Sequence, residues 1–140
     1  MDSLQAVKER YAADTFPRSL GIELLELAPG YARVAMTLTE NMANFHGIGH
    51  GGAIFTLADT ALGLASNSHG DPAIALSVTI NYLSPARVGT KLVATAEEEH
   101  LTRRTGVYRL TVTTSTGENI ALARGTVYRQ AKKWVPEQSS

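Results

Sequence analysis

Apolar and polar residues alternate at period two along several segments of the chain. After a turn at Pro29 and Gly30, every second residue from 32 to 38 is apolar, which predicts a strand with one buried face paired to 22–27. Turn signals at 85–89, 103–104 and 116–117 separate the later segments of this kind. These predict four more strands, over 75–83, 91–98, 105–114 and 118–129.

One segment departs from this alternation. Residues 53–65 are almost wholly apolar, and Asp59 is the only ionisable residue among them. Glycine and proline at 70 and 72 supply the stop expected just after a helix, so the segment predicts one long helix. A helix without a polar face is normally buried, which places Asp59 on a core helix. A shorter amphipathic helix is expected over 3–13.

One long helix and about six mostly antiparallel strands predict an α+β fold in which the sheet curls around the helix. A single sheet covers only one side of a helix, so the remaining apolar face calls for a second copy and predicts a homodimer. The length of 140 residues suits a single domain over 1–140. Within it, an N-terminal helical extension is expected over 1–17 and a flexible tail over 130–140.

Composition narrows the function classes. Thirteen basic residues balance thirteen acidic ones, and no basic run is longer than two, so nucleic acid is not an expected partner. The chain has no cysteine, which excludes disulfides, thiolate metal sites and a cysteine nucleophile. Neither a secretory leader nor a membrane-spanning stretch is evident. A cytoplasmic protein acting on a small molecule is expected.

Asp59 is the leading candidate for chemistry. An unpaired buried carboxylate costs several kcal/mol, and aspartate is a mediocre residue inside a helix. Its presence therefore needs either a chemical use or a structural partner, such as Ser77 or a backbone donor.

Gly51 and Gly52 lie where the long helix begins. Unpaired N–H groups and the positive end of the helix dipole favour an anion, or a carbonyl oxygen that gains charge. Asp59 follows Gly52 by seven residues, about 10 Å along a helix, so one carbonyl cannot touch both. We therefore expect Asp59 of one protomer to meet the glycine turn of another.

Five pieces of the sequence follow one another in a characteristic order and spacing: Asn44, His50-Gly51-Gly52, Leu57-Ala58-Asp59, Ser77 and Tyr82-Leu83-Ser84-Pro85. In these residues the chain resembles PaaI-type hotdog thioesterases, and the likeness spans 20–129. The resemblance implies a hotdog fold and dimers that pair into homotetramers. It also implies hydrolysis of acyl- or aryl-CoA thioesters without metal or bound cofactor, and the family name points to phenylacetate degradation and (hydroxy)phenylacetyl-CoA.

The resemblance also implies roles. Asp59 matches the catalytic carboxylate, a general base on water or a nucleophile, and Ser77 matches the hydroxyl that positions this water. Across the interface, Gly51 matches the N–H donor to the thioester carbonyl. Asn44 matches the amide that meets substrate or water, while His50 holds the loop. A thioester is already activated, so a carboxylate and an oxyanion donor suffice.

Other interpretations remain open. His46 and His50 have the spacing of a metal pair on a helix, but nearby glycines disfavour a helix and no third ligand is evident. Coenzyme A carries phosphates, for which Arg87, Arg103 and Arg104 in predicted turns are candidates. The alternatives in function are a non-catalytic acyl-CoA sensor and a hotdog enoyl-CoA hydratase or dehydratase. The Gly-x-Ser-x-Gly pattern of serine esterases is absent.

Overall fold

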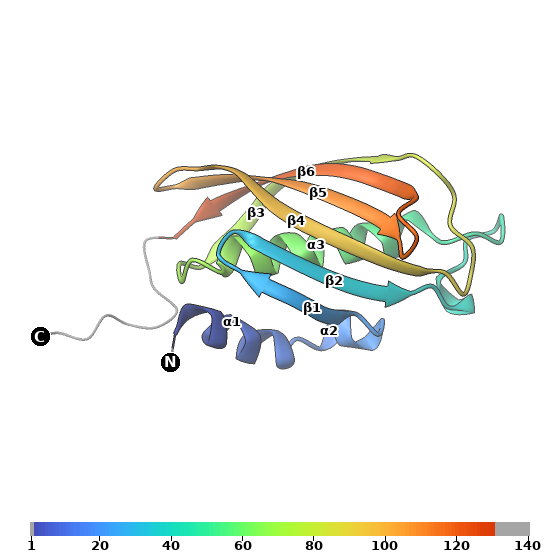
Figure 1. Cartoon of the computed structure of the whole chain (residues 1–140), viewed down its shortest axis with the longest axis horizontal. Coiled ribbons are helices and arrows are strands. Elements are labelled where there is room, and N and C mark those ends of the chain that lie inside the picture. Colours follow the sequence, from blue (N-terminus) through green and yellow to red (C-terminus); the bar gives the residue numbers. More distant parts are fainter. Residues whose placement is uncertain (1, 131–140) are drawn as a thin grey trace, which may run out of the picture.

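The computed structural model describes residues 2–130, in which a curved six-stranded sheet wraps around one long helix (Figure 1). The helical elements are α1 (Ser3–Ala12), α2 (Thr15–Ser19), the 3-10 turn η1 (Glu40–Met42) and α3 (Gly51–Asn67). The strands are β1 (Glu23–Ala28), β2 (Tyr31–Thr37), β3 (Ala73–Tyr82), β4 (Lys91–Leu101), β5 (Thr105–Thr114) and β6 (Asn119–Arg129). The predicted α+β class with six strands around a long helix is confirmed.

The sheet has the strand order β1-β2-β4-β5-β6-β3, and every neighbouring pair is antiparallel. β1 and β2 form the predicted hairpin, whose turn contains Gly30 with a φ of 72°. After α3 the chain crosses to the far side of the sheet, where β3 pairs with β6. β3 is therefore an edge strand, and its outer backbone groups lie along an open edge.

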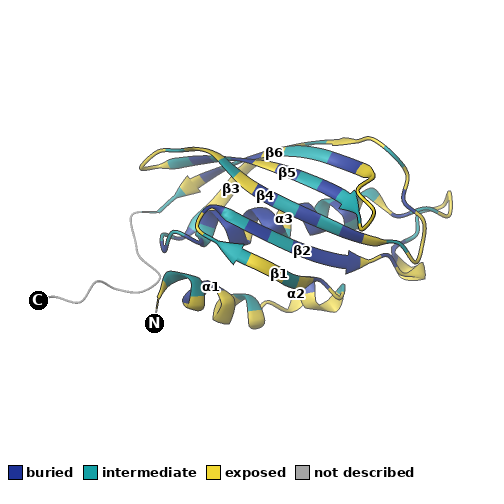
Figure 2. Cartoon of the chain, in the orientation of Figure 1, coloured by how far each residue is buried: buried dark blue, intermediate teal, exposed yellow. Residues whose placement is uncertain are grey.

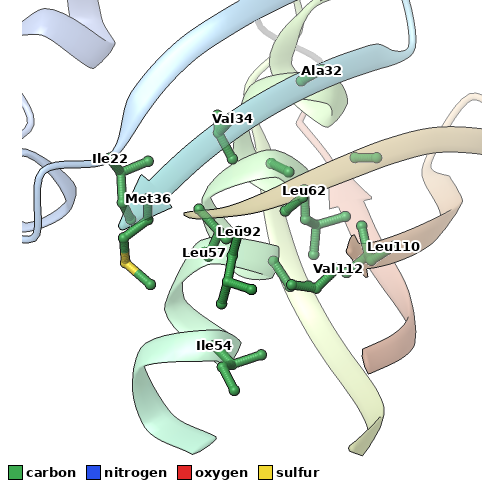
Figure 3. Close-up of a cluster of buried hydrophobic side chains, with 14 of the residues drawn as sticks. Ile22, Ala32, Val34, Met36, Ile54, Leu57, Leu62, Leu92, Leu110 and Val112 are labelled. Carbon is green, nitrogen blue, oxygen red and sulfur yellow. The ribbon is translucent and has the colours of Figure 1, made fainter. Parts of the chain in front are cut away.

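The core lies between α3 and the concave face of the sheet (Figure 3). One side of α3 is fully buried, through Leu57, Ala58, Ala61, Leu62 and Ala65. Small alanines on this side let the strands approach closely. The same crowding explains a glycine in β6, because a Cβ at position 125 would lie 2.7 Å from the side chain of Leu62.

The opposite side of α3 is not covered by the sheet. Asp59 and Gly63 are exposed on this side, and Phe55, Thr56 and Thr60 are half-buried. The expectation that Asp59 is buried in the core is therefore wrong for the single chain. The cause is geometric, since a sheet that curls over one side of a helix leaves a strip of the other side free.

Several boundaries differ from the expected ones. The N-terminal extension contains a second short helix, α2, which begins after Asp14 and brings Pro17 into the core region. β3 begins two residues earlier than expected and β4 runs three residues further, to Leu101. The expected tail over 130–140 lies outside the described residues except for its first position. None of the helices described within 2–130 is long and apolar enough to cross a membrane.

Candidate active site

The loop before α3 is held by its own hydrogen bonds. The Asn44 side-chain oxygen accepts from the N–H of His46 at 2.9 Å, and the Asn44 N–H donates to the Ile48 carbonyl at 2.7 Å. The N–H of Gly49 donates to the Ala86 carbonyl at 2.7 Å, which ties the loop to the segment after β3. The loop is irregular, as expected, yet its position is fixed. The side-chain NH₂ of Asn44 has no partner among the described residues and is available to a ligand.

His50 caps the start of α3. Its Nδ1 accepts from the N–H of Gly52 at 3.0 Å, so the proton of the neutral ring lies on Nε2. This contact agrees with the predicted role of His50 in holding the loop. The neighbouring N–H of Gly51 has no acceptor in the described part of the chain, whereas the Gly51 carbonyl accepts from the Tyr82 hydroxyl at 3.0 Å. Gly51 therefore presents a free donor at the positive end of the helix dipole.

A cavity of about 440 Å³ opens beside this donor. It is lined by Asn44, Ile48, Gly49, Gly51, Ile54, Tyr82, Leu83, Ser84 and Pro85. The lining therefore joins the Asn44 loop, the start of α3 and the Tyr82-to-Pro85 segment, which are far apart in the sequence. A Cβ at position 51 would lie 3.2 Å from the Tyr82 ring, so the glycine also lets the helix start pack against this tyrosine.

Asp59 lies in a second, larger cavity of about 600 Å³. This cavity is bounded on one side by α3 and on the other by α1 and α2. The carboxylate of Asp59 has no hydrogen-bond or ion-pair partner among residues 2–130. Desolvation by the surrounding atoms raises the pKa of Asp59 above its ordinary value, and no cation opposes this shift. An unpaired carboxylate of raised basicity is suited to activating water or to attacking a carbonyl.

Asp59 and the Gly51 N–H belong to different cavities. Among residues 2–130, none lines both of them. The eight residues that separate Asp59 from Gly51 correspond to about 12 Å along α3, whereas groups that act on one carbonyl must converge within about 3 Å. Within one chain, the Asp59 carboxylate and the Gly51 N–H are therefore too far apart to act on the same carbonyl.

The structure does not bring Ser77 to Asp59. A bulge in β3 between Ala75 and Ser77 precedes a stretch in which Val78 and Ile80 pack against the core. Ser77 consequently points to the opposite face of the sheet, where it lines a shallow hollow with Arg109 and Arg124. The hydrogen bond between Asp59 and Ser77 considered from the sequence is not formed.

The three arginines considered for the CoA phosphates lie at two ends of the sheet. Arg87 is exposed beside the Asn44 loop, and it forms a β-bridge with Ile48. Arg103 and Arg104 lie in the turn between β4 and β5, at the other end in Figure 1. Arg104 donates to the Tyr128 hydroxyl at 3.1 Å. Within one chain only Arg87 is next to a predicted site residue.

Sequence reasoning missed the contribution of the N-terminal segment to the Asp59 cavity. Val7, Arg10 and Tyr11 line it from α1, and Asp14, Phe16 and Pro17 line it at the start of α2. The spacing of the first three is that of one helix face, which is the signal that could have revealed this wall.

The described part of the chain contains no group of three or more acidic or histidine side chains that could hold a metal ion. His46 and His50 do not share a helix face, because the loop between them includes Gly47 with a φ of 79°. Nδ1 of His50 is moreover occupied by the N–H of Gly52.

Comparison with known proteins places this site in a family. Residues 46–121 match the thioesterase superfamily. The acyl-coenzyme A thioesterase PaaI of Escherichia coli is 40% identical over 119 residues, which are 85% of each chain. The solved structure of the E. coli PaaI protein, from the phenylacetic acid degradation operon, matches with a TM-score of 0.90 at 37% identity, over 94% of this chain and 95% of that chain.

Two further structures agree. A mutant of the phenylacetic acid degradation protein PaaI from Thermus thermophilus is 44% identical with a TM-score of 0.81, over 84% of this chain and all of that chain (100%). A Streptococcus mutans protein bound to acetyl CoA is 32% identical with a TM-score of 0.77, over 80% and 90% of the two chains. These likenesses confirm the hotdog fold and the thioesterase class expected from the sequence. The chain therefore belongs to the thioesterase superfamily, in its PaaI-type group.

Proposed function

We propose that this protein hydrolyses acyl-CoA thioesters to a free acid and CoA at a site shared between two protomers. The observation that carries the proposal is the pair of unpaired groups on α3, the Asp59 carboxylate and the Gly51 N–H, which lie in different cavities about 12 Å apart. Neither cavity contains both a base and an oxyanion donor. In the proposed dimer, the second copy supplies the missing group to each cavity.

The chemistry follows from these two groups. Asp59 acts as general base on water or as nucleophile at the thioester carbonyl. The N–H of Gly51 of the partner subunit stabilises the oxyanion as the carbonyl oxygen gains charge. The free amide of Asn44 contacts the substrate or the water, and His50 holds the loop. Ser77 receives no role beside Asp59 of its own chain, because it lies on the other face of the sheet. No metal or bound cofactor takes part in the proposal.

The open edge of β3 supports the dimer. Ile74 and Leu76 on this strand are 56% and 64% exposed, which is unusual for large apolar residues at the edge of a sheet. Pairing of β3 with β3 of a second copy would satisfy the free edge and cover these side chains. A tetramer of two such dimers in the cytoplasm completes the proposed assembly.

The proposed substrate class is aryl-acyl-CoA, such as phenylacetyl-CoA or hydroxyphenylacetyl-CoA. The likeness to PaaI proteins of phenylacetic acid degradation supports it, as does the cavity beside Asp59, which includes the aromatic side chains of Tyr11, Phe16 and Phe55. Arg87 is the nearest of the three candidate arginines to the Gly51 cavity and is the proposed contact for a CoA phosphate.

The first experiment measures free-thiol release from phenylacetyl-, hydroxyphenylacetyl-, benzoyl- and linear acyl-CoA thioesters. The proposal would be supported if the wild type hydrolyses some of these thioesters selectively and Asp59→Asn does not, with its fold and oligomeric state intact. The control is Glu118→Gln, which neutralises a carboxylate in the exposed turn before β6. Saturable binding without thiol release would instead indicate an acyl-CoA sensor, and hydration of an enoyl-CoA without thiol release would indicate a hydratase.

A second experiment tests the shared site. Gly51→Pro removes the free N–H, and proline is well tolerated at the first residue of a helix. Gly51→Ala meets the same Tyr82 ring but keeps the N–H, so it is the matched control. Mixing inactive Asp59→Asn with inactive Gly51→Pro should restore up to about a quarter of wild-type activity, since half the random dimers hold one intact site. No recovery after confirmed subunit exchange would place both groups in one chain's site.

A further inference from the structure

The cavity beside Asp59 is a groove between two helical faces. Its floor is the side of α3 that the sheet leaves uncovered, and its opposite wall is formed by α1 and α2, which run along the edge of the molecule next to β1 (Figure 1). The α3 residues on the floor recur at intervals of three or four, and they are Phe55, Thr56, Asp59, Thr60, Gly63, Leu64 and Asn67. The groove therefore continues along α3 on both sides of Asp59.

Gly63 is unusual among these residues. It lies one helical turn beyond Asp59, about 6 Å along the axis. Its φ is not in the positive range, so the backbone does not require glycine. A Cβ at this position would meet no atom within 4 Å, so no neighbour requires glycine either. Glycine inside a helix is less favourable than alanine. A side chain at position 63 would instead fill part of the groove.

We propose that Gly63 determines the size of the acyl group that the protein accepts. This inference rests on the proposed thioesterase function, in which the reacting carbonyl lies at Asp59. From there the acyl group extends along the groove, and a ring-sized group reaches the level of Gly63. An acetyl group, with a single carbon beyond the carbonyl, does not reach it.

The walls of the groove fit a flat apolar group. Phe16 is 61% exposed in the single chain, and Tyr11 and Phe55 line the same cavity. Tyr11 is held in place, since its hydroxyl donates to the Ile22 carbonyl at 2.9 Å. Aromatic rings stack on or pack edge-to-face against another ring, which favours an aryl group over a linear chain of similar length.

The test compares kcat/KM for acetyl-, butanoyl- and phenylacetyl-CoA in the wild type, Gly63→Ala and Gly63→Leu. Gly63→Leu is expected to lower kcat/KM for phenylacetyl-CoA about tenfold or more relative to acetyl-CoA, with Gly63→Ala in between. Lys8→Leu is the control, because it adds the same side chain to α1 at an exposed position that does not line the groove. Phe16→Ala changes the opposite wall, and it is expected to raise KM for phenylacetyl-CoA by a larger factor than KM for acetyl-CoA.

Sedimentation of each variant distinguishes the outcomes. An unchanged acyl profile in Gly63→Leu, with wild-type turnover present, would overturn this inference and leave the thioesterase function standing. Equal loss for every thioester together with dissociation would also overturn it, because Gly63 would then be the close-approach point of a second copy. Absence of thiol release by the wild type on every thioester would overturn both proposals.

Discussion

Polar groups just beyond the C-terminal end of α3 are paired with one another, whereas two polar groups further toward its start are unpaired. Beyond its C-terminal end, His69 Nε2 lies 2.6 Å from Glu98 Oε1, which also accepts from the hydroxyl of the fully buried Tyr108 at 3.1 Å. Nearby, Arg129 pairs with Asp71 at 2.9 Å. At the N-terminal start and the middle of α3, by contrast, the Gly51 N–H and the Asp59 carboxylate have no partners among the described residues.

The paired groups stabilise the fold, whereas the unpaired groups are available for chemistry. Buried and half-buried polar groups that satisfy one another contribute to a defined structure, and each becomes costly when its partner is removed. A carboxylate left unpaired in a cavity contributes nothing of this kind, and desolvation makes it a net cost to folding. In Figure 2 the part of α3 seen behind β2 and β4 is coloured mostly as buried, whereas Asp59 and Gly63 on its uncovered side are exposed.

The sharpest contrast is expected from Asp59→Asn. Loss of the proposed general base or nucleophile should lower kcat by at least two to four orders of magnitude, since a general base alone typically contributes about 10²–10⁴. Because Asp59 has no partner to lose, the melting temperature at neutral pH should stay the same or rise. Thiol-release assays and thermal unfolding check the two halves. A large fall in melting temperature would show that Asp59 has a structural partner.

The reverse pattern is expected at the other end of the helix. Glu98→Ala removes the acceptor of the Tyr108 hydroxyl and of His69, and leaving such a buried donor unsatisfied costs about 1–3 kcal/mol. The free energy of unfolding should fall by this amount in urea titrations, with kcat unchanged. Glu97→Ala, one position earlier and exposed on β4, is the matched control and should be nearly neutral. A lowered kcat in folded Glu98→Ala would show that catalysis depends on the hydrogen bonds beyond the C-terminal end of α3.

Gly63→Ala tests whether glycine at this position keeps the groove open at a cost to the stability of α3. Alanine should stabilise the helix by up to about 1 kcal/mol, since no atom opposes its Cβ. The same variant should reduce turnover of ring-sized acyl groups. Urea unfolding and the acyl-CoA panel measure the two effects. A loss of stability would instead indicate that the helix needs glycine at this position.

The smallest expected effect is a shift to higher pH of the acid limb in the pH profile of kcat/KM. In the proposed mechanism only ionised Asp59 is active, so kcat/KM falls as the pH drops through its pKa, and partial desolvation in the cavity places this limb above the ordinary value of about 3.9. The folded chain also holds this proton more tightly than the unfolded chain. Folding therefore becomes slightly less favourable as the pH rises through the raised pKa, a trend that Asp59→Asn should remove. An acid limb at or below the ordinary aspartate value would contradict the shift.

The placement of Ser77 shows where sequence reasoning reaches its limit. Asn44, Gly51 and the Tyr82-to-Pro85 segment were named from the sequence only as parts of one motif, and in the structure all of them line one cavity. The resemblance also grouped Ser77 with Asp59. In a strand, a shift of one residue turns a side chain to the opposite face, and the bulge before Ser77 has this effect on register.

The sequence by itself determined the strands and the long helix of this protein, but not the short α2, since periodicity and turn residues act locally. The six strands, the long helix and the isolated Asp59 all follow from such local patterns. The tertiary structure decided what these patterns leave open. It showed which side of an apolar helix a curved sheet leaves free, which cavity each catalytic candidate faces, and that α1 and α2 form a wall beside Asp59. Burial and cavities depend on contacts between residues far apart in the chain, and a local pattern does not specify them.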